Sequence, residues 1–210
     1  MKIQLALDRL SIDHALEIAR SCENEVDLFE IGTSLIKEFG MESIRAFRKV
    51  FPNKVLLADM KIIDNALYEA NIAFLAGADV ITVMGCSPTV TIELVARVAR
   101  EKKKTYMIDL LATDKVQRKT LREKFKDAIF CLHISKDVQE KQQIVFNSED
   151  ISWQGYKVAV AGGINKETIK SIADKIAPEI FIVGGAITKV PKPQNIAKEL
   201  RALININDEG

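Results

Sequence analysis

Short apolar runs alternate with longer, more polar segments along the whole chain. The runs are rich in Val, Ile and Leu, and they cover residues 3–7, 26–32, 55–61, 79–85, 105–111, 128–135, 157–163 and 180–187. Within a run, apolar residues are continuous rather than alternating, which is typical of strands buried on both faces of a parallel sheet. The segments between the runs have mostly helical spacing of apolar residues. The pattern therefore predicts eight strand–helix units.

Capping and turn residues indicate where several of the helices begin or end. Ser11 or Asp13 is suited to cap the first helix, and Gly77 is suited to end the helix that follows the third run. Pro88 is suited to the first turn of the next helix. Residues 34–51 form one long amphipathic segment, which we expect to be helical throughout.

Eight strand–helix units in 210 residues favour a (β/α)8 barrel. An open, doubly wound sheet is the alternative, but no Gly-x-Gly-x-x-Gly pattern follows the first run, where a dinucleotide-binding fold of that kind would carry it. No linker rich in Pro, Gly or Ser divides the chain. We therefore expect an α/β protein with a single barrel domain over residues 1–210.

The composition is that of an ordinary soluble globular protein. Hydrophobic residues make up 48% and charged residues 28%, and the net charge of +1 suggests neither nucleic acid nor an anionic membrane as a partner. No apolar run approaches the roughly 18 residues of a membrane span, and an acidic residue at position 8 interrupts the first run too early for a signal sequence. The three widely spaced cysteines suit free thiols in a reducing compartment. These features predict a cytoplasmic protein.

Charged residues and a histidine lie where the predicted strands end. They are Asp8, Glu30, Asp59, Lys61, Asp109 and His133. In a (β/α)8 barrel the active site lies at the carboxyl ends of the strands, so these residues would share one end of the barrel. A single charge there is commonly a solvated loop residue, and a single histidine is commonly a satisfied core residue. Several such residues interrupting runs that should be buried indicate a functional site instead.

Two of these carboxylates are suited to bind a metal ion. Glu30 and Asp59 end neighbouring strands, and Mg²⁺ commonly takes one or two carboxylates with waters and ligand oxygens. Such an ion would polarise a carbonyl and stabilise an enediolate. Lys61 is two residues from Asp59 and would point to the same side of the strand. An imidazole titrates near neutral pH, so His133 is a candidate for proton transfer.

Glycine pairs follow the last two predicted strands, in AGGI at residues 161–164 and in VGGAI at residues 183–187. In barrels of this kind the loops after strands seven and eight frequently bind phosphate through backbone N–H groups. Glycine lets the backbone approach an anion closely and adopt positive φ. The two pairs predict a phosphate site.

Several motifs together resemble one branch of the orotidine 5′-monophosphate decarboxylase suprafamily. They are LALD at 5–8, EIGT at 30–33, DMKIID at 59–64, VAGGI at 160–164 and VGGAIT at 183–188. The branch contains the 3-hexulose-6-phosphate synthases and the 3-keto-L-gulonate-6-phosphate decarboxylases. The resemblance covers nearly the whole chain, and the Asp-x-Lys-x-x-Asp pattern after the third run is its most specific part.

The resemblance implies a role for each site residue. Glu30 and Asp59 would bind Mg²⁺, Lys61 would contact the reacting oxygens, and His133 would transfer protons. Asp64 would reach into the partner's site across the interface of a homodimer. The remaining residues would bind the substrate, a phosphorylated pentulose or hexulose. Its sugar part would be bound by Asp8, Thr33, Asp109 and Lys136. Its phosphate would be bound by Gly163, Gly184 and Gly185.

The two enzymes of this branch share an enediolate intermediate. The synthase forms it by removing a proton from D-ribulose 5-phosphate and then adds it to formaldehyde, whereas the decarboxylase forms it by losing CO₂. Asp109 and the two glycine motifs favour the synthase, and Lys136 favours the decarboxylase. A barrel that binds a sugar phosphate without turnover is a more remote alternative.

The chain departs from the family pattern at three places. Asn65 follows Asp64 where Ala and then Gly are usual, Gly185 replaces an Arg that many members use for the phosphate, and residues 137–150 lack the usual small residues. These departures affect the expected choice of substrate more than the expected fold.

Overall fold

The computed structural model describes residues 1–139 and 153–205. The eight strands are β1 (Lys2–Leu7), β2 (Leu28–Ile31), β3 (Val55–Ile62), β4 (Val80–Met84), β5 (Thr105–Asp109), β6 (Ile129–His133), β7 (Lys157–Ala161) and β8 (Ile180–Val183). The helices are α1 (Ile12–Cys22), α2 (Thr33–Phe39), α3 (Met41–Val50), α4 (Ala66–Ala76), α5 (Thr89–Glu101), α6 (Lys115–Lys124), α7 (Lys136–Gln139), α8 (Ile169–Ile176), α9 (Gly185–Thr188) and α10 (Pro193–Asn205).

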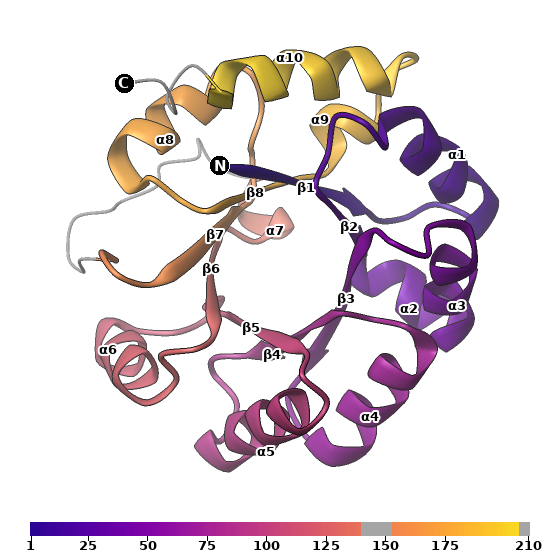
Figure 1. Ribbon diagram of the computed structural model, residues 1–210. Helices are drawn as coiled ribbons and strands as arrows, with labels where there is room; N and C mark the ends of the chain where they lie inside the picture. The colour runs from indigo at the N-terminus through magenta and orange to yellow at the C-terminus, as the bar shows by residue number, and fades with distance from the viewer. Residues whose placement is uncertain (140–152, 206–210) are drawn as a thin grey trace.

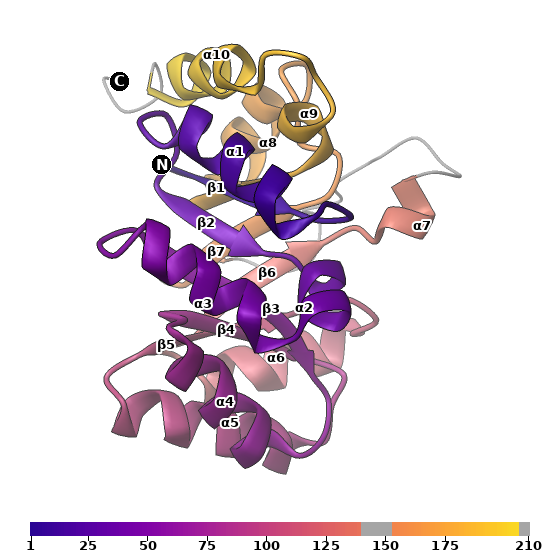
Figure 2. The same ribbon diagram turned by 90° about the vertical axis from the view of Figure 1, so that its right-hand side faces the viewer.

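The strands close into a parallel barrel in chain order, with β8 paired to β1. Figure 1 looks along the barrel axis from the end where the strands begin, with the helices outside the ring of strands. Figure 2 shows the barrel from the side, with α7 beyond the end where the strands finish. The predicted (β/α)8 barrel is confirmed. Of the departing segment 137–150, residues 140–150 lie outside the described residues.

The strands are buried on both faces because the barrel has two apolar layers. Residues on the outer face of the strands pack against the surrounding helices in one large cluster that includes Phe29, Phe47 and Phe130. Residues at every second position face inward and fill the barrel interior; these include Leu57, Val80, Met107, Cys131, Ala159 and Ile182. This alternation explains the continuous apolar runs in the sequence.

Several strands are shorter by a few residues than the apolar runs that predict them, and three further details differ from the sequence prediction. The predicted helix over residues 34–51 is two helices, because Gly40 ends α2 in a positive-φ conformation (φ 60°) and α3 starts directly after it. The last predicted strand over residues 180–187 is wrong beyond Val183, since residues 185–188 form α9. Pro88 is the N-cap residue of α5 rather than part of its first turn.

The other expected caps are present. The Ser11 side chain accepts a hydrogen bond from the His14 N–H and caps α1, so Asp13 is not the cap. Gly77 ends α4 with φ 114°.

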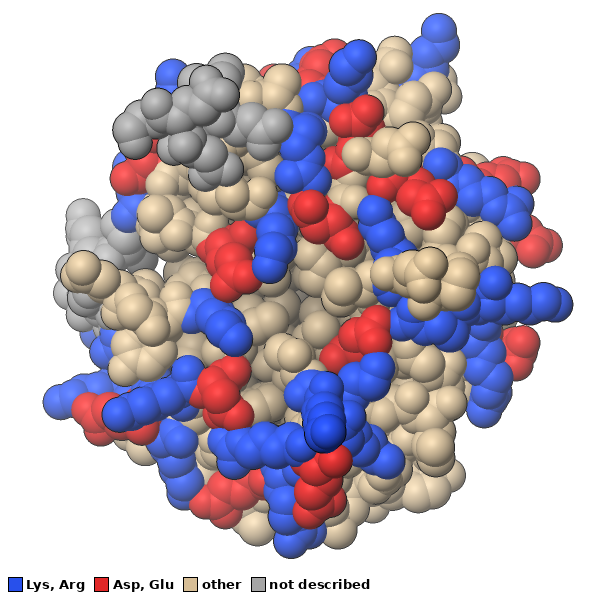
Figure 3. All heavy atoms as spheres, in the orientation of Figure 1, with Lys and Arg blue, Asp and Glu red and all other residues tan. Residues whose placement is uncertain are grey.

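Ion pairs link the amino ends of the strands. Asp79 accepts hydrogen bonds from the Leu56 N–H, from Lys104 (2.6 Å) and from Arg48. Asp27 accepts hydrogen bonds from the Ile3 N–H and from Arg201. Figure 3 shows this face of the molecule, where acidic and basic side chains lie next to one another around the barrel axis. None of the described helices combines the length and the apolar character that crossing a membrane requires.

Candidate active site at the carboxyl ends of the strands

The inward-facing positions of the strands become polar at the carboxyl end of the barrel. Side chains two positions apart on a strand face the same way, so the next inward residue on four strands lies directly above the apolar interior. These pairs are Asp59 above Leu57, Thr82 above Val80, Asp109 above Met107 and His133 above Cys131. Strand periodicity therefore brings a polar cluster to the mouth of the barrel.

Asp109 joins two other candidate residues. Its Oδ2 atom lies 2.8 Å from Nδ1 of His133 and accepts a hydrogen bond from Lys61 Nζ at 2.9 Å, while its Oδ1 accepts from the Leu111 N–H. Burial alone would raise the pKa of Asp109, but the hydrogen bond and charge of His133, together with Lys61, hold it well below its usual range. Asp109 is therefore an ionised acceptor, and Nδ1 of His133 is the donor in their hydrogen bond.

Asp59 is buried in a shell of hydrogen-bond donors. Its Oδ2 accepts from Thr33 Oγ1 at 2.6 Å, and its Oδ1 accepts from Thr82 Oγ1 at 2.7 Å. Lys61 Nζ lies 3.3 Å from Oδ1 and 3.1 Å from Oδ2. These contacts fix the carboxylate in one orientation, as a preorganised site requires.

A local distortion of β3 places Lys61 between the two aspartates. The β3–β4 register shifts between Ala58 and Ile62, and Lys61 has a left-handed backbone (φ 48°), which costs a non-glycine residue free energy. The Lys61 N–H donates to Thr82 Oγ1 at 2.8 Å and helps to hold this conformation. Burial would lower the pKa of Lys61, but the charges of Asp59 and Asp109 raise it well above its usual value. Lys61 therefore remains a cation at neutral pH.

Glu30 lies beneath this cluster and is almost completely buried. Its Oε2 accepts a hydrogen bond from Gln4 Nε2 at 2.5 Å. Burial raises the pKa of Glu30 to about 8, and the negative charge of Asp59 adds to the effect. The ionised form of Glu30 is therefore unfavourable by itself, and a nearby cation would stabilise it.

The donor set around Glu30 and Asp59 suits Mg²⁺. Within residues 1–139 and 153–205 no three His, Cys, Asp or Glu side chains gather as a closed metal site, so the chain offers two carboxylates. Mg²⁺ needs only one or two, with waters and substrate oxygens completing its shell. The carboxylates repel one another, and Gln4 Oε1 is buried without a hydrogen-bond partner in the described part of the chain. Both observations fit a cation at this position.

Asp8 lies on the same rim but is held separately, by the start of α2. Its Oδ1 accepts hydrogen bonds from the Ser34 N–H at 3.0 Å and from Ser34 Oγ at 2.6 Å. A Cβ atom at Gly32 would collide with the Asp8 carboxylate and with the Leu7 carbonyl oxygen. The glycine of the EIGT motif is therefore required by the close approach of these two strand ends.

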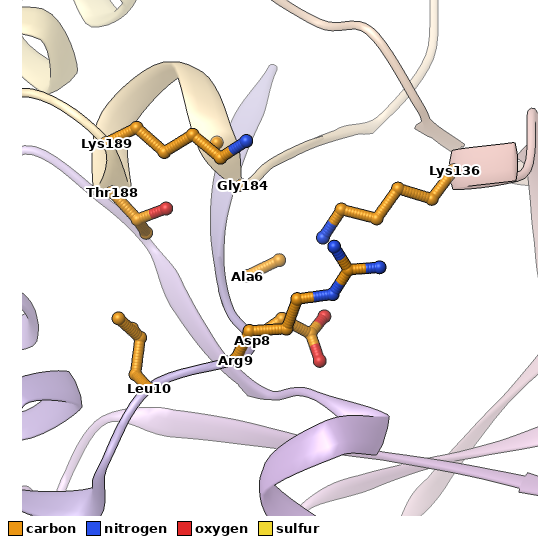
Figure 4. Close-up of a pocket in the computed structure, with 9 residues that line it drawn as sticks. Ala6, Asp8, Arg9, Leu10, Lys136, Gly184, Thr188 and Lys189 are labelled. Atoms are coloured by element: carbon orange, nitrogen blue, oxygen red, sulfur yellow. The ribbon is translucent and has the colours of Figure 1, made fainter. Parts of the chain in front are cut away.

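A pocket of about 140 Å³ lies beside Asp8. It is lined by Ala6, Asp8, Arg9, Leu10, Lys136, Gly184, Gly185, Thr188 and Lys189. Figure 4 shows the Lys136, Arg9 and Lys189 side chains extending toward the space in front of Ala6 and Gly184. The predicted residues Gly184, Gly185 and Lys136 thus lie together here. Gly163 follows β7 with φ 67° and is not among the residues that line this pocket.

Asp64 lies apart from the other predicted site residues. It is exposed in the loop between β3 and α4, where its Oδ1 accepts a hydrogen bond from the Asn65 N–H at 2.7 Å. Within the described residues, none of its hydrogen bonds is to the Asp59–Asp109 cluster. Close to it in the sequence, Ile63 (56% exposed), Leu67 (42%) and Tyr68 (61%) have large, exposed apolar side chains.

Several site residues were not predicted from the sequence. Gln4 and Thr82 each interrupt an apolar run, as the predicted aspartates do, so the same signal would have found them. Ser34 follows the EIGT motif directly. Arg9 and Lys189 resemble ordinary loop cations in the sequence, and only the closure of the barrel brings them to one pocket.

Comparison with known proteins places this site in a family. The model of the orotidine 5′-phosphate decarboxylase/HUMPS family matches residues 1–200. The chain is 37% identical to a 3-hexulose-6-phosphate synthase from Mycobacterium gastri, with 97% of this chain and 100% of the relative covered.

Two solved structures resemble the whole barrel at 29% identity and a TM-score of 0.86 each. The first is a 3-hexulose-6-phosphate synthase from Salmonella typhimurium, with 98% of this chain and 99% of that chain covered. The second is a 3-keto-L-gulonate-6-phosphate decarboxylase from Vibrio cholerae, with 98% of this chain and 97% of that chain covered. The suspected branch is confirmed, and both of its activities occur among the relatives.

Proposed function

The chain is a lyase of the orotidine 5′-phosphate decarboxylase/HUMPS family, and we propose that it is a 3-hexulose-6-phosphate synthase, which joins formaldehyde to D-ribulose 5-phosphate. The observation that carries this proposal is the position of Asp109 between His133 and Lys61. This arrangement places a base, His133, and a fixed cation, Lys61, on either side of one carboxylate at the mouth of the barrel. A reaction that removes a proton and leaves an enediolate needs both groups.

His133 would act as the base. Because Asp109 accepts the Nδ1 proton, the remaining nitrogen, Nε2, carries the lone pair. A base whose tautomer is fixed in this way presents its lone pair to the C1 proton of the substrate. Asp109 would thus orient the imidazole and stabilise the imidazolium that forms.

Lys61 would stabilise the negative charge that develops on the substrate oxygens. Its raised pKa keeps it protonated, and its ammonium is held by Asp59 and Asp109 before substrate binds. A preorganised cation in a site with little water stabilises a developing negative charge more strongly than a cation in solution does. When bound, Mg²⁺ held by Glu30 and Asp59 would polarise the substrate carbonyl and add to this stabilisation.

The active form would be a homodimer with its sites at the interface. Asp64 is exposed, and the exposed apolar residues Ile63, Leu67 and Tyr68 lie close to it in the sequence. Exposed apolar residues next to a polar group are typical of an interaction surface. We propose that this surface meets a second copy, so that Asp64 completes the partner's site.

The second candidate function is decarboxylation of 3-keto-L-gulonate 6-phosphate. Lys136 favours it, because a cation at the same rim would help to hold a proton donor for the enediolate. The decarboxylase makes its enediolate by losing CO₂ and does not need a base for that step.

A parallel assay distinguishes the two functions. The purified protein is incubated with D-ribulose 5-phosphate and formaldehyde, and separately with 3-keto-L-gulonate 6-phosphate, each with Mg²⁺. The proposal predicts a hexulose 6-phosphate in the first reaction and little CO₂ in the second. Efficient CO₂ release without condensation would assign the decarboxylase function instead.

A further inference from the structure

The Thr82 side chain connects two residues at the mouth of the barrel. It lies on β4 and is 3% exposed. Its Oγ1 accepts a hydrogen bond from the Lys61 N–H at 2.8 Å and donates one to Asp59 Oδ1 at 2.7 Å. A backbone N–H can only donate, so the hydroxyl proton is left for the carboxylate. One hydroxyl therefore holds the backbone of Lys61 and the side chain of Asp59 at the same time.

Thr82 lies opposite the irregular part of β3. The pairing of the two strands is such that residues 58–62 of β3 span the same stretch as residues 81–83 of β4, with Thr82 in the middle of the shorter segment. The longer segment contains Lys61, and a peptide N–H in a partly buried segment needs a hydrogen-bond partner. The Thr82 hydroxyl thus supplies a hydrogen bond at the place where the regular strand pairing is interrupted.

The conformation that this hydrogen bond maintains is unfavourable by itself. Lys61 has φ 48°, in the left-handed region, where a residue with a Cβ atom is strained. Such a conformation persists only where the surrounding structure holds it. It accompanies a position of Lys61 Nζ that is 3.1 Å from Asp59 Oδ2 and 2.9 Å from Asp109 Oδ2. The position of the ammonium therefore depends on a backbone conformation that Thr82 stabilises.

Packing alone does not require a hydroxyl at this position. Val has the same branched shape as Thr, is equally suited to a strand, and has no polar group that must be satisfied when it is buried. The hydroxyl of Thr82 is therefore explained by the two hydrogen bonds that it makes, and both of them are to residues of the proposed active site.

We propose that Thr82 is a positioning residue of the active site, whose hydroxyl keeps Lys61 in its left-handed conformation and thereby keeps the ammonium beside the reacting oxygens of the substrate. This inference rests on the proposed role of Lys61 as the cation that stabilises the enediolate. Thr82 acts through Lys61 rather than through a contact of its own with the substrate. Asp59 is also held by Thr33, through a hydrogen bond of 2.6 Å, so loss of the Thr82 hydroxyl should displace Lys61 more than Asp59.

Three substitutions separate the hydroxyl from the shape of the side chain. Thr82→Val keeps the shape and removes the hydroxyl, whereas Thr82→Ser keeps the hydroxyl. Thr82→Cys replaces it with a thiol, a weaker hydrogen-bonding group that is well tolerated in apolar surroundings. Thr91→Val, which removes a buried hydroxyl from α5, is the matched control.

The experiment combines kinetics with structure. Steady-state assays with Mg²⁺ and formaldehyde give kcat and the KM for D-ribulose 5-phosphate, and thermal melting checks that each variant is folded. Crystal structures of the wild type and of Thr82→Val show the backbone of Lys61. If Thr82→Val does not fold, Thr82→Cys takes its place in both measurements.

Thr82→Val should lower kcat at least about tenfold and leave KM nearly unchanged, because a displaced charge no longer matches the transition state while substrate binding is retained. Thr82→Ser should recover most of the lost kcat, and Thr91→Val should have the wild-type value. In the Thr82→Val structure, Lys61 should have left the left-handed region. A wild-type kcat in the folded variant that lacks the hydroxyl, or equal losses in Thr82→Ser and Thr82→Val, would overturn the proposal.

The crystal structures do not depend on the reaction. If Lys61 changes conformation in Thr82→Val as predicted, but the wild type catalyses neither condensation nor decarboxylation, the proposed function fails and the hold of Thr82 on Lys61 stands. If the wild type joins formaldehyde to D-ribulose 5-phosphate and Thr82→Val does so at the same rate, the positioning role fails and the function stands.

Discussion

The Nδ1 atom of His133 lies 2.8 Å from Oδ2 of Asp109, a buried carboxylate whose pKa is held well below its usual range. This contact fixes Nδ1 as the protonated nitrogen and leaves the lone pair on Nε2, as the proposed role of a base requires. It also links β6 to β5 at the mouth of the barrel, so the orientation depends on the rigid sheet rather than on a loop.

Asp109→Asn should therefore impair catalysis more than folding. The Asn amide is neutral and can donate a hydrogen bond to Nδ1, so it would allow the wrong imidazole tautomer. It would also remove the ion pair with Lys61. We expect kcat to fall by about 10²–10⁴-fold, the usual contribution of an oriented base. Steady-state kinetics with thermal melting measures this; a variant with wild-type kcat would show that Asp109 does not orient the base.

Loss of either proposed metal ligand should remove most activity. Glu30→Gln and Asp59→Asn each lose a charged ligand oxygen, whereas Glu17→Gln removes an exposed carboxylate of α1 and should have no effect. The same loss should follow EDTA treatment of the wild type and should be reversed by added Mg²⁺. Full turnover of the wild type in EDTA would refute the metal assignment.

Subunit mixing tests whether Asp64 serves the neighbouring site. In a dimer of Asp64→Ala and Lys61→Ala chains, one site carries both changes and the other carries neither. Random mixing should restore activity at about one quarter of the sites, although each variant alone is inactive. Proven subunit exchange without any recovery would show that each site is built within one chain.

Asp79 should stabilise the amino end of the barrel in a pH-dependent way. Burial would raise its pKa, but Lys104, the Leu56 N–H and Arg48 lower it below the usual value. A lowered folded-state pKa contributes stability above the unfolded-state pKa of about 4, and that stability is lost as pH falls through the folded-state pKa.

Asp79→Asn should therefore lower the free energy of unfolding by about 1–3 kcal/mol at pH 7 and by less at pH 3. Urea unfolding at both pH values measures the difference, and the exposed Asp174→Asn is the control. An equal loss at both pH values would show that the charge of Asp79 is not responsible.

The strands and their order were predictable because residues buried on both faces leave a continuous apolar run. Asp59 and Asp109 could be predicted as site residues for a related reason: a charge that interrupts such a run is buried and needs a partner. Gly40 was missed as a helix boundary because the apolar spacing continues across it from α2 to α3.

The pocket beside Asp8 was predictable only in part. Gly184 and Gly185 carry a local signal, because paired glycines after a strand are typical of anion loops. Arg9 and Lys189 carry none: they are 180 residues apart, and they come together because β8 pairs with β1. A contact that depends on closure of the barrel has no pattern in the local sequence.

Proton exchange at C1 of D-ribulose 5-phosphate, measured by NMR in D₂O with Mg²⁺ and without formaldehyde, tests the central claim most directly. The account predicts that the wild type exchanges this proton and that His133→Ala slows the exchange at least about 10²-fold. Exchange by His133→Ala at the wild-type rate would contradict the account.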